Sequence, residues 1–222
     1  MNKLWLWIKA VPAAMATPFL LAIAAVGIAL CDLFWLVFGR RDAAHSDTMP
    51  NTSAASVVIP NWNGRDLLEK YLPSVITALA GNSANEIIVV DNGSKDGSAE
   101  FVRERFPAVK LLALADNLGF GGGSNAGFQA AKNDIVVLLN SDMRVDERFL
   151  APLLAGFTDS SVFAVSCQIF FSDSSKKREE TGLTQAHWVD GHLRIRHVID
   201  DDIGELYPCY YGGGGSCAFD RR

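Results

Sequence analysis

Four short runs of β-branched and aliphatic residues follow one another after residue 55, and they constrain the fold more than any other feature. The runs cover residues 56–60, 86–90, 110–114 and 134–139. The second, EIIVV, shows no polar alternation, which is typical of a strand buried on both faces. Segments with helical spacing or composition cover residues 67–79, 98–106, 125–131 and 147–157, and a strand-rich stretch covers 161–171. This alternation predicts an α/β fold with a mainly parallel sheet.

Polar, glycine-rich segments follow all four predicted strands. They read NWNG at 61–64, DNGSKDGS at 91–98, DNLGFGGGSN at 116–125 and NSD at 140–142. In open α/β sheets, ligands bind beyond the carboxyl ends of the strands. Ordinary turn chemistry explains one or two such loops. Four consecutive ones predict a shared binding site.

The N-terminal region has a different character. Residues 10–31 carry no charge, and a helix of that length spans about 33 Å, which is enough for a bilayer core. The run is longer than the apolar region of a signal peptide. We therefore predict a membrane anchor over residues 1–41, either a single span or an interfacial or re-entrant helix pair. The small, polar residues 42–55 predict a flexible linker, and 56–222 the globular domain.

Charge and cysteine usage exclude some classes of site. After residue 50 the chain holds 16 Lys and Arg against 22 Asp and Glu, a balance of −6. Such an acidic domain does not suit nucleic-acid backbone binding. The four cysteines form no C-x-x-C pair, which argues against structural zinc and favours reduced thiols. Farther along, Asp190-Gly191 between apolar pairs predicts a tight β-hairpin.

In order and spacing, the strand-end segments resemble the inverting glycosyltransferases of family 2, which have the GT-A fold. The matching stretches are VVIPNWNG at 57–64, VVDNGSKDGS at 89–98, NLGFGGGSNAG at 117–127 and LLNSD at 138–142. The pattern is most similar to the branch of rhamnosyltransferases and other cell-surface polysaccharide enzymes. The resemblance implies a Rossmann-like α/β/α sandwich, the nucleotide-diphospho-sugar transferase architecture, over residues 56–222.

The resemblance also implies roles for individual residues. Asp91 would accept the imide N–H of a uracil or thymine base, so the donor would be a UDP- or dTDP-sugar, and residues 119–125 would wrap the diphosphate. Asp142 would be the second acid of a D-x-D-like motif and bind Mg²⁺ or Mn²⁺, hard cations that prefer oxygen ligands. The first position of this motif is Asn140 here, where the family pattern has an acid. The implied donor-site residues are Pro60, Asn61, Asn63, Asp91, Asn92, Ser94, Asn117, Gly119, Gly122, Asn125, Asn140 and Ser141, with Asp142 as the metal ligand.

The implied reaction moves the sugar, with inversion, to a hydroxyl of a glycan or lipid-linked acceptor in cell-surface polysaccharide or glycolipid synthesis. In the family, the general base is an acid downstream of the segment resembled by residues 212–222. We therefore expect the base beyond Arg222 and the domain to be C-terminally incomplete, and we assign no base within the chain. Because nucleotide-sugars are made in the cytosol, we expect the domain at the cytoplasmic face of a membrane.

Two alternatives stay open. The pattern Gly121-x-Gly123-x-x-Ala126, with Asp142 about twenty residues on, fits an NAD(P)-binding fingerprint, although its first glycine does not directly close a strand. The chain could also be a catalytically inactive, membrane-anchored module that binds nucleotide-sugars. Binding of NAD(P) rather than a UDP- or dTDP-sugar would favour the first alternative over a transferase. Absence of sugar transfer by the chain would favour the second.

Overall fold

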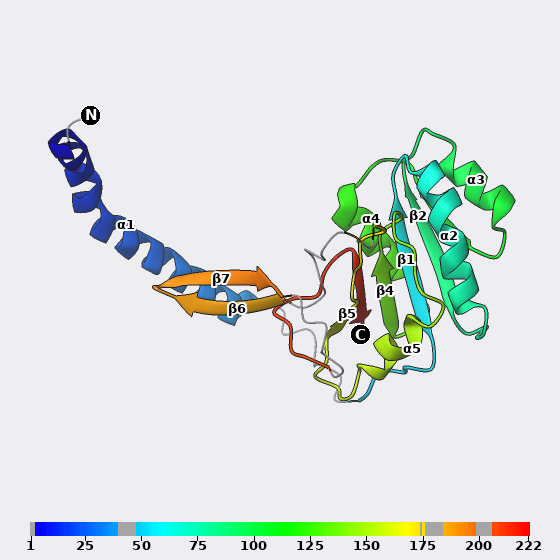
Figure 1. Cartoon of the computed structure of the whole chain (residues 1–222). Coiled ribbons are helices and arrows are strands. Elements are labelled where there is room, and N and C mark those ends of the chain that lie inside the picture. The colour runs from blue at the N-terminus through cyan, green and yellow to red at the C-terminus, as the bar shows by residue number, and fades with distance from the viewer. Residues whose placement is uncertain (1–2, 40–47, 174, 176–183, 199–205) are drawn as a thin grey trace. The chain divides into compact units, whose positions relative to one another are not determined.

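The chain divides into two compact units, Met1–His45 and Ser46–Arg222. A computed structural model describes residues 3–39, 48–173, 175, 184–198 and 206–222 (Figure 1). In the first unit, the described residues form one helix, α1 (Lys3–Phe38), followed by Gly39. Its segment Ala14–Phe38 is long and apolar enough to cross a membrane, and the side chains in it are exposed. The predicted apolar helix before the domain is therefore present.

The second unit is built on a six-stranded sheet with the order β3-β2-β1-β4-β8-β5 (Figure 1). Four neighbouring strands are parallel, and β8 runs antiparallel to both of its neighbours. The strands are β1 (Ala55–Asn61), β2 (Glu86–Asn92), β3 (Lys110–Leu114), β4 (Ile135–Leu139), β5 (Ala164–Ser166) and β8 (Ser216–Asp220). A separate two-stranded sheet pairs β6 (Thr184–Val189) with β7 (His192–His197). These pairings confirm the predicted α/β fold and the hairpin at Asp190-Gly191.

Helices cover both faces of the large sheet. One core lies between the sheet and the helices α2 (Arg65–Leu79), α3 (Ser98–Arg105) and α5 (Leu150–Ala155). The other lies between the sheet and α4 (Gly119–Ala130). Successive residues of β1 alternate between the cores, with Val57 in the first and Val58 in the second. Because both faces of β1, β2 and β4 are buried, these strands are mainly apolar, which explains the apolar runs within them.

Three predicted elements have different bounds in the structure. Helix α4 begins at Gly119, six residues before the predicted start, so the whole segment 119–125, which is predicted to wrap the diphosphate, is helical. Helix α5 begins at Leu150 rather than 147, because Asp146 holds a turn by accepting the Arg148 backbone N–H at 2.9 Å. Of the predicted strand-rich stretch 161–171, only Ala164–Ser166 is a strand.

The linker is shorter than predicted. Ala54 is buried, and the Asn51 backbone N–H donates to Asp134 Oδ2 at 2.9 Å. The side chain of Asn82 donates to the Ser53 carbonyl at 2.8 Å. Residues 51–55 therefore belong to the folded domain, while 42–47 lie outside the described residues.

Candidate functional site

The site begins where β1 and β2 end side by side. Asn61 and Asp91 are register partners, and their side chains are 2% and 3% exposed. Asn61 Nδ2 donates to Asp91 Oδ1 at 3.5 Å, and the Ser94 backbone N–H donates to Asp91 Oδ2 at 3.2 Å. Both distances are at or beyond the long end of the usual range for such bonds. The carboxylate is therefore positioned but only weakly bonded within the protein.

The other amide atom of Asn61 is more unusual. Asn61 Oδ1 is buried and has no hydrogen-bond partner within the part of the chain that the structure describes. It faces Gly64, where a Cβ would lie only 2.4 Å away. An unpaired buried acceptor costs free energy and marks a place where a ligand or water completes the bonding.

The loops after β1 and β2 are bonded to each other. Asn63 Oδ1 accepts the Lys95 N–H at 2.8 Å, and Ser94 Oγ accepts the Asn63 N–H at 2.9 Å. Asp96 accepts the backbone N–H groups of Arg65 and Ser98 and the Ser98 hydroxyl. Partial burial opposes ionisation of Asp96, but these hydrogen bonds hold the pKa of its carboxyl below the ordinary value. Asn63 and Ser94 thus fix the two loops relative to each other.

Asn92 fixes the start of α4. Its Oδ1 accepts the Leu118 N–H at 2.9 Å, and its Nδ2 donates to Asn117 Oδ1 at 3.0 Å and to the Gly119 carbonyl at 2.9 Å. Gly93 permits this close approach: its φ is +71°, and a Cβ there would lie 2.8 Å from the Asp116 backbone. The side-chain amides of Asn92 and Asn117 are therefore engaged in the scaffold of the loop.

Replacing Asn92 by alanine should destabilise the domain. The substitution removes three hydrogen bonds to residues 117–119, and each such bond contributes about 0.5–1.5 kcal/mol net. Urea unfolding measures the loss. Asn125→Ala is the control, because Asn125 is exposed on α4, the helix whose start Asn92 holds. Equal stability of the two variants would contradict a scaffolding role for Asn92.

The end of β4 forms the other side of the site. The Asn140 backbone N–H donates to the Gly215 carbonyl at 2.9 Å, and a Cβ on Gly215 would lie 2.9 Å from Asn140 Nδ2. Gly214 lies against the ring of Phe120 at the start of α4. Ser141 is half-buried and Asp142 is exposed. The glycine run 212–215 therefore borders the site, a placement that depends on the pairing of β8 with β4.

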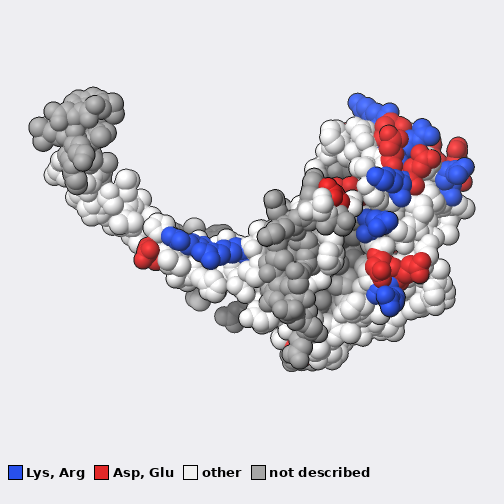
Figure 2. Space-filling model, viewed as in Figure 1, with Lys and Arg blue, Asp and Glu red and all other residues white. Residues whose placement is uncertain are grey.

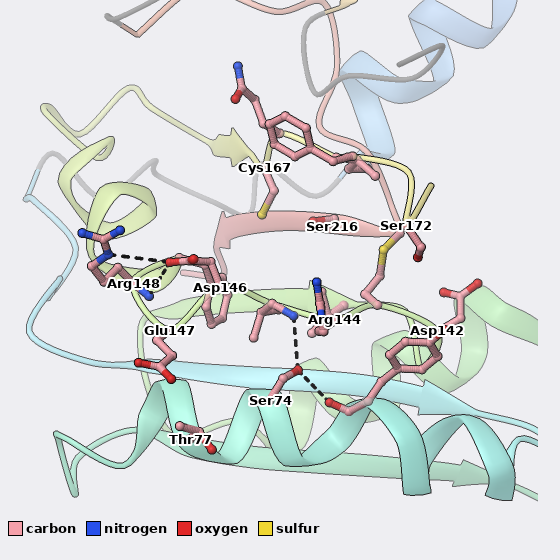
Figure 3. Close-up of a pocket in the computed structure, with 18 of the residues that line it drawn as sticks. Ser74, Thr77, Asp142, Arg144, Asp146, Glu147, Arg148, Cys167, Ser172 and Ser216 are labelled. Carbon is pink, nitrogen blue, oxygen red and sulfur yellow. Dashed lines mark hydrogen bonds and ion pairs between the residues drawn. The ribbon is translucent and has the colours of Figure 1, made fainter. Parts of the chain in front are cut away.

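A cavity of about 920 Å³ opens beside Asp142 (Figure 3). It is lined by α2, by residues 142–149, by residues 167–172 and by Ser216. Ser74 Oγ accepts the Val145 N–H at 3.2 Å and so joins α2 to the loop after β4. Asp142 and Arg148 lie toward opposite ends of the cavity, and Arg148 forms a 3.8 Å ion pair with Asp146. No sequence pattern indicates this cavity, because its walls come from four separate segments.

The cysteines near this region do not form a nucleophilic centre. Burial raises the pKa of the Cys217 thiol to about 12, against a weaker opposing hydrogen bond with Ser166. Burial also raises the pKa of Cys167, which lines the cavity. Because the thiolate is the reactive form, both thiols are poor nucleophiles at neutral pH.

The structure brings most of the predicted residues to the carboxyl edge of the sheet, but in different environments. Asn61 and Asp91 are buried together, whereas Asn63, Ser94, Asn92 and Asn117 bond the loops. Gly122 packs against Leu118, and a Cβ there would lie 2.5 Å from the Leu118 Cβ. Among the described residues no group of three or more His, Cys, Asp or Glu side chains could hold a metal ion. Any cation at Asp142 would therefore need further ligands, such as water or substrate oxygens.

Several known proteins are similar to part of this chain. A protein of Edwardsiella ictaluri named undecaprenyl-phosphate 4-deoxy-4-formamido-L-arabinose transferase is 38% identical over 94 residues, 40% of this chain and 29% of that protein. The glycosyltransferase AglE of Haloferax volcanii is 26% identical over 75% of this chain and 60% of its own length. The dolichol-phosphate mannosyltransferase of Pyrococcus furiosus is 29% identical over 50% of this chain and 32% of its own length. The chain thus spans about a third to 60% of these relatives.

Solved structures support the fold. The structure of S. aureus TarS 1-349 in complex with UDP-GlcNAc superposes with a TM-score of 0.50 at 20% identity, covering 60% of this chain and 39% of that one. Residues 56–213 match the family described as Glycosyl transferase family 2. This match includes all four strand-end segments and favours the transferase interpretation over the dinucleotide one. The chain therefore belongs to glycosyl transferase family 2.

Proposed function

We propose that this chain binds the donor in an inverting glycosyltransferase that uses a UDP- or dTDP-sugar. The observation that carries the proposal is the buried Asn61–Asp91 pair, with its unpaired Asn61 Oδ1 and weakly bonded carboxylate. Uracil and thymine both present an imide N–H flanked by two carbonyl oxygens. Asp91 or Asn61 Oδ1 would accept that N–H, and Asn61 Nδ2 would donate to a neighbouring carbonyl.

The diphosphate would lie between the start of α4 and the end of β4. The first backbone N–H groups of a helix have no partner inside the helix, and the helix dipole favours an anion there. Glycines at positions 119 and 121–123 let a ligand approach the backbone closely. The start of helix α4, rather than a loop, would thus bind the diphosphate.

Asp142 fits a divalent cation that is held mainly by the substrate. Its carboxylate is exposed at the strand end, and Mg²⁺ is often bound by one or two carboxylates plus substrate phosphates. Bound there, Mg²⁺ or Mn²⁺ would stabilise the charge that develops on the diphosphate. Without such a cation, Asp142 would repel the diphosphate within a domain that is already acidic.

In the proposed reaction, an acceptor oxygen forms a bond to the anomeric carbon as the bond from that carbon to the phosphate oxygen breaks. The nucleoside diphosphate leaves with the electron pair, and a hydroxyl acceptor gives its proton to a general base. The cavity beside Asp142 supports an acceptor approach, because it adjoins the proposed diphosphate position and offers both aromatic and arginine side chains.

The acceptor would be lipid-linked, and the enzyme would act at a membrane. Two relatives carry a lipid phosphate, undecaprenyl-phosphate or dolichol-phosphate, in their names. The apolar helix Ala14–Phe38 is long enough to anchor the chain in the bilayer that holds such a lipid. We further propose that the domain faces the cytosol, where nucleotide-sugars are made, and acts in cell-surface polysaccharide or glycolipid synthesis, as the rhamnosyltransferase-like branch does.

Replacing Asp91 by asparagine tests the donor site. Losing a charge-assisted hydrogen bond costs about 1.5–3 kcal/mol, so UDP or dTDP should bind roughly 10- to 150-fold more weakly. Calorimetric titration of the detergent-solubilised chain measures this, with Asp159→Asn as the control at an exposed acid between α5 and β5. Unchanged nucleotide binding in Asp91→Asn would leave Asp91 a structural residue. Tighter binding of NAD⁺ than of either nucleotide by the unmodified chain would overturn the proposed donor.

A further inference from the structure

The hairpin of β6 and β7 has two chemically different faces. The register pairs Ala186 with Ile195 and Trp188 with Leu193, so these four side chains share one face. The other face carries His187, Val189, His192, Arg194 and Arg196, together with Gln185. Because strand side chains alternate, one ribbon presents an apolar surface on one side and a basic surface on the other.

The apolar face is exposed and continues into the next segment. Trp188 is 75% exposed, and Leu193 and Ile195 are also exposed. Tyr211 packs edge-on against His197, which is on this face, and against Tyr210. Hydrogen bonds from the Tyr210 and Tyr211 backbones to Thr184 hold these two tyrosines beside the ribbon. The result is an exposed aromatic and aliphatic surface, larger than scattered apolar residues produce.

The charge of the hairpin contrasts with that of its domain. With histidine counted as neutral, residues 184–197 contain two arginines against one acid, Asp190, a balance of +1, whereas the chain after residue 50 has a balance of −6. Figure 2 shows basic atoms gathered along the hairpin. An anionic surface would therefore attract this ribbon and repel the rest of the domain.

We propose that the hairpin β6–β7 lies flat in the headgroup region of an anionic lipid bilayer. Its apolar face, with Trp188, would reach the acyl boundary, and Arg194 and Arg196 would lie among the lipid phosphates. The combination of an aromatic and aliphatic face with a basic one is the pattern of elements that lie in a membrane interface, and Trp and Tyr are enriched there. The proposal rests on the membrane attachment proposed above but not on sugar transfer.

The experiment compares the full chain in nanodiscs of phosphatidylcholine with nanodiscs that also contain phosphatidylglycerol. An isolated two-stranded ribbon is only marginally stable in water, so its amides should exchange with deuterium readily unless a surface covers it. We expect peptides spanning 184–197 to exchange more slowly in the anionic discs at low salt, with the difference lost at high salt. Peptides from α3 are the internal control and should exchange equally in both.

Two variants separate the contributions of the two faces. Arg194→Gln with Arg196→Gln should remove the dependence on lipid charge, which corresponds to a roughly 10- to 30-fold weaker partitioning of the hairpin. The double variant Trp188→Ser, Ile195→Ser should remove the protection of the hairpin amides from deuterium exchange in both neutral and anionic discs. Equal exchange of the hairpin in anionic and neutral discs would overturn the proposal. The proposal would also be overturned if, in detergent without lipid, the hairpin amides exchanged more slowly as the protein concentration rose. That result would mean that a second copy of the chain covers the surface. Titrating the same variants with UDP tests the donor site separately. Unchanged UDP binding in a variant would show that a change in hairpin exchange does not come from loss of the donor site.

Discussion

Replacing Asp142 by alanine is expected to abolish the metal dependence of nucleotide binding. The expected loss follows from the available metal ligands. Asp142 is the exposed carboxylate that follows β4, and the described residues contain no group of three or more His, Cys, Asp or Glu that could hold a metal ion. In the proposed site, a cation held by the Asp142 carboxylate and the diphosphate would lose its protein ligand in the variant. Where transfer can be measured, removing such stabilisation of developing charge should reduce turnover by about 100-fold or more.

The measurement is a titration of UDP into the full chain with Mg²⁺, with Mn²⁺ and with EDTA. Asp134→Asn is the matched control, because Asp134 adjoins the opposite end of β4, and asparagine keeps an acceptor for the Asn51 N–H. The unmodified chain and the control should bind UDP more tightly with metal than with EDTA. The same enhancement by Mn²⁺ in Asp142→Ala would remove Asp142 from the metal site.

Gly127→Ala is expected to be among the most destabilising single changes in the domain. A Cβ at this position would lie 2.2 Å from Val58 Cγ1 and 3.0 Å from Val90 Cγ2. Both valines are fully buried in neighbouring strands, so neither can move away without disturbing the sheet. Overpacking of this kind costs about 1–3 kcal/mol or more, and for a domain of this size each kcal/mol lowers Tm by about 2–4 °C.

Gly121→Ala provides the control within the same helix. A Cβ there would meet nothing within 4 Å, and alanine is a better helix former than glycine by up to about 1 kcal/mol. In thermal unfolding, the Tm of Gly127→Ala should therefore be well below that of the unmodified chain. The Tm of Gly121→Ala should equal that of the unmodified chain or exceed it. A Gly127→Ala variant with unchanged Tm would mean that α4 does not pack on β1 and β2 at this distance.

The amino-acid sequence by itself determined the layered architecture and the edge of the sheet at which the candidate site is expected. The runs at 57–60 and 87–90 are apolar at every position, because both faces of a central parallel strand are covered by helices. This local pattern predicts strands with bounds close to those of β1 and β2. Since parallel strands end at the same edge, the polar segments that follow them predict a shared site, and Asn61 and Asp91 are indeed neighbours there.

Only the tertiary structure decided which polar residues are free to bind a ligand. Asn92 and Asp91 are adjacent in the chain and equally buried, yet Asn92 is fully engaged with residues 117–119, whereas Asp91 has only long hydrogen bonds. Glycines that predict a loop also form the first turns of α4, because packing against β1 and β2 compensates for their weak helix propensity. The pairing of β8 with β4 joins residues about 80 positions apart, and it sets the glycine run 212–215 beside Asn140. No local periodicity encodes such a contact, because its stabilisation comes from a neighbouring strand distant in sequence.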